Sequence, residues 1–144
     1  MKKIIFAVIL ITKFFLYGNY EKDFIARADK INSEVEAVLR TVTSLDKSQK
    51  GFIEEKLKEL QEEFDNIYRL LMKSLSFEEQ EKLEEDQKLW EKEREKTMDI
   101  VRERIKEKEK NHQWLMEKGG EFEIIRQRVI TLAKRYDSIQ NKVE

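Results

Sequence analysis

Polar and aromatic side chains recur at helical spacing between residues 83 and 94, and they are the positions of this chain best suited to form a site. On a helix at about 100° per residue, Leu83, Gln87, Trp90 and Arg94 lie within a strip about 60° wide. The strip is continued by Thr97, Met98, Val101 and Ile105. A strip this narrow is a candidate buried face, yet it carries an amide, an indole N–H and a guanidinium. Buried polar groups have to be hydrogen-bonded, and a buried charge is costly unless it is paired. We therefore interpret this polar stripe as an interhelical polar lock, the commoner role of such residues, or as a binding site.

The same stretch resembles a known family motif. Leu83-x3-Gln87-x2-Trp90-x3-Arg94, followed by Glu95, is similar to the central motif of the lysozyme inhibitor LprI family. Upstream, the segment Phe64-Asp65-Asn66-Ile67-Tyr68 resembles the family's Leu-Asn-x-x-Tyr signature, with Phe and Asp in place of Leu and Asn. Downstream, Gly119-Gly120 and a following helix with Arg135 and Ile139 resemble its closing segment. The resemblance covers roughly residues 60–140, and it departs at Met98, where family members usually carry Cys.

The resemblance implies a function in protein binding. It implies an exported bacterial envelope protein that binds a protein partner, with a lysozyme as the candidate, and inhibits that partner instead of catalysing a reaction. The positions that it implies are Tyr68, Leu83, Gln87, Trp90 and Arg94, acting in the lock or in binding. The alternative is a structural or adhesive envelope protein whose long helix associates as a coiled coil.

Composition predicts an all-α fold. The chain has 144 residues, 41% of them charged, with four Gly and no Pro, a profile typical of one domain of long helices. The absence of Cys excludes a disulfide, a thiolate metal site and a thiol nucleophile. We expect an antiparallel helical bundle of about four helices, one of them long.

Apolar periodicity places these helices. The first is predicted over about 21–43 and the second over about 50–74, with Gly51 closing the turn between them. Ser76-Phe-Glu-Glu79 reads as a capping box that begins the third helix, which has no breaker before Gly119-Gly120. Its charged segment, 102–110, is expected to project as a solvated rod or to bend. The fourth helix should follow the glycine pair, with an apolar face formed by Phe122, Ile125, Val129, Leu132, Tyr136 and Ile139.

The N-terminus resembles a secretory signal. Lys2 and Lys3 precede an apolar run over 4–12, interrupted by Lys13. We predict that residues 1–18 are a signal peptide cleaved near Gly18, or an uncleaved anchor that would be the chain's only membrane contact. Residues 19–144 are then a single domain, periplasmic or secreted. Removing three lysines takes the formal charge from −1 to −4, which argues against nucleic-acid binding.

No catalytic constellation is recognisable. The single His112 has no Cys partner, and Glu109-x-x-His112 has the spacing of only half a di-iron carboxylate site. Phosphate loops and dinucleotide fingerprints are missing, so we expect no enzyme activity, metal, cofactor or small-molecule substrate. Residues 78–96 contain nine acids and five bases, which suggests a docking surface for a cationic protein.

Overall fold

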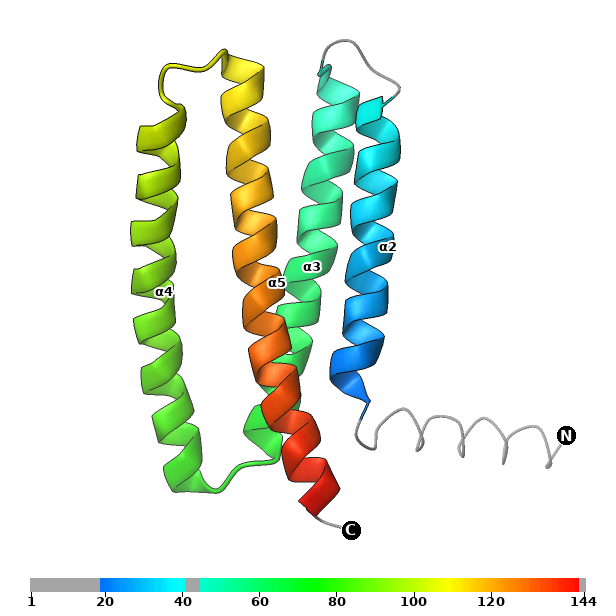
Figure 1. Ribbon diagram of the computed structural model, residues 1–144. Helices are drawn as coiled ribbons and strands as arrows, with labels where there is room; N and C mark the ends of the chain where they lie inside the picture. The colour runs from blue at the N-terminus through cyan, green and yellow to red at the C-terminus, as the bar shows by residue number, and fades with distance from the viewer. Residues whose placement is uncertain (1–18, 41–44, 143–144) are drawn as a thin grey trace, which may run out of the picture.

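The computed structural model describes residues 19–40 and 45–142, which form four helices. These are α2 (Tyr20–Arg40), α3 (Lys47–Lys73), α4 (Phe77–Ile105) and α5 (Lys110–Lys142). Consecutive helices run in opposite directions (Figure 1), and the described residues contain no strand. The predicted all-α antiparallel bundle is confirmed, and α5 is the longest helix with 33 residues. The predicted signal peptide and residues 41–43, the predicted end of the first helix, lie outside the described residues.

Helix α5 is central to the packing. It contacts each of the other three helices, while α2 packs on both α3 and α5 (Figure 1). Residues of the main core from α2, α3 and α5 are almost completely buried, and α4 adds Leu83 to them. Burial of this apolar surface is the main force that holds the helices together. The core comprises Phe24, Ala28, Leu60, Ile67, Leu71, Leu75, Leu83, Ile125, Val129, Leu132, Ala133 and Tyr136.

Helix α3 begins before the predicted position. Asp46 is its N-cap, and the Asp46 carboxylate accepts a 2.8 Å hydrogen bond from the Gln49 backbone N–H. The Gln49 side chain accepts one of 2.8 Å from the Asp46 N–H in return, which completes a capping box. Gly51 therefore lies inside α3, and the prediction that it closes the turn is wrong. The paired cap outweighs the modest helix penalty of one glycine.

The boundary between α4 and α5 also differs from the prediction. The chain reverses at residues 106–109, so the solvated-rod alternative is wrong. Glu109, the residue before α5, caps the helix. Its carboxylate accepts hydrogen bonds from the backbone N–H groups of Asn111 and His112, at 3.0 and 3.2 Å. The Gln113 side chain then donates to the Lys106 and Lys108 carbonyls of the turn. Side-chain caps thus stabilise a turn that contains neither Gly nor Pro.

The glycine pair that was predicted to separate two helices lies within α5. Gly120 faces α4, where a Cβ would lie 3.6 Å from the Met98 sulfur and 3.8 Å from a methyl group of Val101. Each glycine lowers helix propensity by about 1 kcal/mol, a penalty that packing between α4 and α5 can outweigh.

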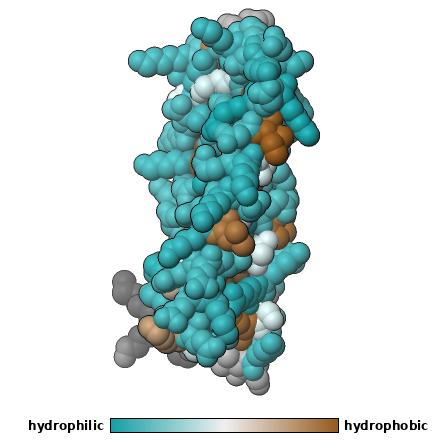
Figure 2. Space-filling view, turned by 90° about the vertical axis from the view of Figure 1, so that its left-hand side faces the viewer, coloured by the Kyte–Doolittle hydropathy of each residue, from teal (hydrophilic) through white to brown (hydrophobic). Residues whose placement is uncertain are grey.

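The start of α4 agrees with the prediction. The Ser76 hydroxyl accepts from the Glu79 backbone N–H, and the Glu79 carboxylate accepts from the Ser76 N–H at 3.0 Å. The hydrogen bonds that the Ser76 N–H and hydroxyl donate to the Glu79 carboxylate lower the pKa of that carboxyl. The outer face of α4 is mostly hydrophilic, with separate hydrophobic patches (Figure 2). No helix in the described ranges has both the length and the apolar character needed to cross a membrane.

The first turn of α2 is fixed by the far end of α5. The Asp137 carboxylate accepts hydrogen bonds from the backbone N–H groups of Tyr20 and Glu21, both at 3.0 Å. A carboxylate at this position satisfies orphan N–H groups and complements the helix dipole. Asp137 therefore caps α2 across the bundle, although the two residues that it binds are more than 100 positions away.

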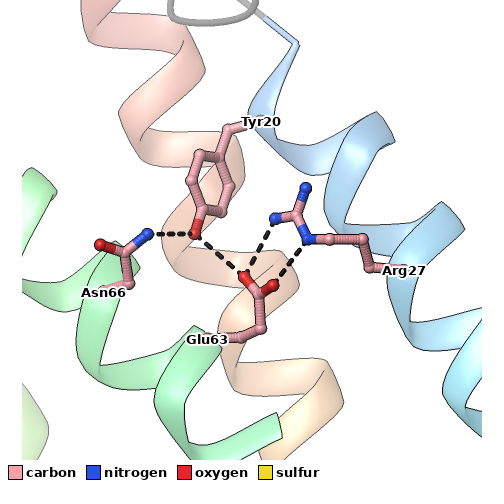
Figure 3. Close-up of polar contacts among 4 residues, drawn as sticks. All are labelled: Tyr20, Arg27, Glu63 and Asn66. Carbon is pink, nitrogen blue, oxygen red and sulfur yellow. Dashed lines mark hydrogen bonds and ion pairs between the residues drawn. The ribbon is translucent and has the colours of Figure 1, made fainter. Parts of the chain in front are cut away.

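A second cluster joins the same end of α2 to α3 (Figure 3). Arg27 donates two hydrogen bonds to the Glu63 carboxylate, at 2.6 and 3.0 Å, and Tyr20 donates a third at 3.2 Å. The Asn66 amide donates to the Tyr20 hydroxyl at 3.1 Å. Burial, together with the Glu63 charge, raises the pKa of Tyr20, so the hydroxyl stays neutral and can donate.

Replacing Asp137 with Ala should lower the free energy of unfolding by about 1–2 kcal/mol, the usual effect of losing a helix N-cap. Chemical denaturation measures the loss. Asp65→Ala on the exposed face of α3 is the control and should have a much smaller effect. Equal effects of the two substitutions would show that the cap across the bundle does not stabilise α2.

Candidate functional site

The structure places the polar stripe along the inner side of α4. Leu83 and Gln87 are buried, and Trp90 and Arg94 are half-buried. Met98 and Ile105 continue the buried strip, whereas Thr97 is exposed. The helical spacing in the sequence thus corresponds to a real face, although the geometry does not by itself assign a lock or a binding site to these residues.

Trp90 connects α4 to α3. Its ring stacks on Phe64, with ring centroids 5.6 Å apart and planes inclined by 17°. Phe64 in turn stacks on Tyr68, at 6.1 Å and 22°. Phe64, which stands where the resemblance has Leu, therefore lies between Tyr68 and Trp90 and joins them into one row of rings.

Two arginines lie over the Trp90 ring. The guanidinium carbon of Arg94, from the same helix, is 5.7 Å from the ring centroid, and that of Arg128, from α5, is 5.4 Å away. Both distances are within the range of a cation–π interaction. The indole thus contacts side chains from three helices, α3, α4 and α5.

Arg128 is the hydrogen-bonding partner of Gln87. Its Nε and Nη2 donate to the Gln87 Oε1, at 3.2 and 2.9 Å, and Nη2 also donates to Asp86 at 2.8 Å. Both Arg128 and Gln87 are only 8% exposed, while the Asp86 side chain is 57% exposed. The positive charge of Arg128 is therefore neutralised by the Asp86 carboxylate at the exposed edge of the contact between α4 and α5. The neutral Gln87 amide is its buried partner.

This contact fixes the orientation of the Gln87 amide. Arginine has only donors, so the amide oxygen has to face Arg128 and the amide nitrogen has to point elsewhere. That nitrogen is buried, and it has no hydrogen-bond partner among the residues that the structure describes. Gln87 therefore retains an unused donor beside the aromatic row.

Arg128 was not singled out by the sequence reading, yet its signal was available. It stands three residues after Ile125 and four before Leu132, on the face of α5 that is otherwise apolar. The argument that identified Gln87 as an unusual polar residue on a buried face applies equally to Arg128. His112 is exposed, and its backbone is held by Glu109. In the part of the chain that is described, no three potential ligands form a metal site.

Comparison with known protein families identifies the family of this chain. The model of the family described as lysozyme inhibitor LprI matches residues 41–135, about two thirds of the chain. The chain belongs to the LprI family. No curated protein and no solved structure matches it.

The matched segment of this LprI-family protein contains all of α3 and α4 and most of α5. Tyr68, Leu83, Gln87, Trp90 and Arg94 all lie within it, as does Arg128, whereas α2 lies outside it. The aromatic row and the Gln87–Arg128 contact thus lie within the segment that matches the family model.

Proposed function

We propose that this LprI-family protein is exported to the bacterial envelope, where it binds a cationic protein partner, a lysozyme being the candidate, and inhibits it. Family membership carries the proposal, because the matching family model describes lysozyme inhibitors. The N-terminal segment, with two lysines followed by an apolar run, supports export.

The surface of α4 fits a cationic partner. Residues 78–96 have four more acids than bases, and most of these side chains are exposed. An excess of negative charge on one helix attracts a positively charged protein and increases the rate of productive encounter. The function proposed here is therefore binding, with no catalytic step assigned to any residue of the chain.

The protein should slow the lysis of bacterial cell walls by a cationic lysozyme, without degrading the walls or the lysozyme itself. Raising the salt concentration should weaken this inhibition, because salt screens attraction between exposed charges. Turbidity of a cell-wall suspension, followed at increasing protein concentrations, measures the effect. Unchanged lysozyme rates at high micromolar protein would contradict the proposal.

The structural or adhesive alternative predicts a different behaviour. A protein acting through coiled-coil association would form stable oligomers, whereas an inhibitor of the proposed kind can act as a monomer. Light scattering of the same preparation used for the lysis experiment distinguishes the two. A stable oligomer that does not affect lysozyme would favour the structural role.

A further inference from the structure

A groove lies between α3 and α4, beside the aromatic row. It has a volume of about 350 Å³ and is lined by Phe64, Tyr68, Glu84, Gln87, Lys88 and Glu91. One wall, formed by Phe64 and Tyr68 of α3, is aromatic and half-buried. The other wall belongs to α4 and carries the amide and the charged groups. Because Phe64 is stacked between Tyr68 and Trp90, Tyr68 is the ring of this wall that is left for a ligand, and an aromatic ring opposite carboxylates suits a planar cation better than an apolar side chain.

The carboxylates of the groove are available to a ligand. Glu84 and Glu91 are seven residues apart, so they project from α4 within about 20° of each other. Both are exposed, and neither forms an ion pair with another described residue. Both line the same groove as Tyr68, and their charges, after burial, raise the pKa of the Tyr68 hydroxyl. Lys88 lies between them and leaves the groove with a formal charge of −1.

The second, independent observation is the Gln87 amide. Gln87 is 8% exposed and lines the groove, and its nitrogen has no acceptor in the described part of the chain. A buried donor without an acceptor is costly, so an oxygen that reaches it would remove this cost. That nitrogen has almost no solvent-accessible surface, so the exposed side chains of Lys88 and Glu91 have to move aside to admit such a group.

We propose that this groove binds an arginine side chain of the partner protein together with a neighbouring backbone carbonyl. The guanidinium lies against the aromatic wall and donates to Glu84 and Glu91, while the carbonyl oxygen accepts from the Gln87 amide. A guanidinium fits better than an ammonium, because it is planar and offers five donors in a fixed arrangement. The identity of the occupant rests on the proposed function, since the arginine is taken to come from the cationic partner.

The first experiment uses N-acetyl-arginine N-methylamide as the probe and NMR of the full chain as the readout. Saturable shifts are expected at the Gln87 side-chain amide and at Tyr68, with binding in the millimolar range. The citrulline analogue has nearly the same shape without the charge and should not bind. An arginine probe that gives no saturable shift at these residues, or a citrulline analogue that binds equally well, would overturn the assignment of the groove.

Substitutions then test the charges. Glu84→Gln with Glu91→Gln should weaken binding of the arginine probe by about 5-fold to 10-fold, the effect of losing two exposed ion pairs. Lys88→Gln should strengthen it, because the groove becomes more negative. The matched control is Glu85→Gln with Glu93→Gln, which changes the net charge equally at positions about 100° or more away around α4. If the control pair weakened binding of the arginine probe equally, the probe would be held by general electrostatic attraction, and the groove would not be its binding site.

The same variants in the lysozyme experiment distinguish failure of the groove from failure of the proposed function. Loss of inhibition in the Glu84/Glu91 pair alone supports the groove as the contact site. Inhibition that survives in this pair overturns the groove and leaves the proposed function standing. Specific binding of the arginine probe by a protein that inhibits no lysozyme supports the groove's chemistry but contradicts the proposed function.

Discussion

Replacing Trp90 with Ala should lower the free energy of unfolding by about 3 kcal/mol, the low end of the range for a large aromatic residue. The low end applies because the ring is half-buried. The loss should nevertheless be large, because the indole stacks on Phe64 and lies beneath Arg94 and Arg128. Urea denaturation followed by circular dichroism measures the change.

Trp90→Phe is the matched control for this prediction. A phenyl ring retains stacking on Phe64 and a face for the two guanidinium groups, so its loss of stability should be much smaller than that of the Ala variant. A free energy of unfolding that does not change in Trp90→Ala would show that the aromatic row does not hold α4 against α3.

Arg128→Ala should lower the free energy of unfolding by about 2–4 kcal/mol. The substitution leaves the buried Gln87 oxygen without a donor, which alone costs about 1–3 kcal/mol, and removes the packing of the aliphatic stem. Arg94→Ala should cost only about 0.5–1 kcal/mol, because that side chain is half-exposed and contributes chiefly a cation–π contact. The two arginines over one ring therefore differ in what they stabilise.

A double substitution isolates the polar contact. Arg128→Met keeps an unbranched apolar side chain but leaves Gln87 unsatisfied, so it should still be destabilising. Adding Gln87→Leu should recover much of that loss, because replacing both polar partners by apolar groups removes the unsatisfied donor and acceptor. Additive losses in the double variant would show that Arg128 and Gln87 do not act as a pair.

Periodicity was a good guide to which residues of α4 lie inside. The spacing of the polar stripe predicted the burial of Leu83 and Gln87, and the stripe's continuation predicted that of Met98 and Ile105. The same continuation included Thr97, which is exposed. It could not identify the partner of Gln87, because spacing along one helix carries no information about which residue of another helix lies opposite. The contact between Gln87 and Arg128 could not be predicted from the sequence for this reason.

Helix boundaries were less predictable, and the errors have a common physical cause. Gly51 and Gly119-Gly120 were read as breaks, yet a glycine's helix penalty is small beside the free energy of packing a long helix. The actual turn at 106–109 depends on Glu109 and Gln113, which cap through their side chains. Glu is not among the preferred N-cap residues, so the sequence predicted a bend in 102–110 only as one of two alternatives and did not predict where a new helix begins.

The central position of α5 has a consequence for how the chain is made. The ribosome synthesises this helix after α2, α3 and α4, yet all three pack on it. A nascent chain that ends before Lys110 lacks Ile125, Val129 and Leu132 and can bury only part of the core. Folding of these three helices therefore has to wait for the 33 residues of α5, a delay of about 2–7 s at usual rates of translation. During that interval the emerging polypeptide stays largely unfolded, the state in which chaperones can engage it.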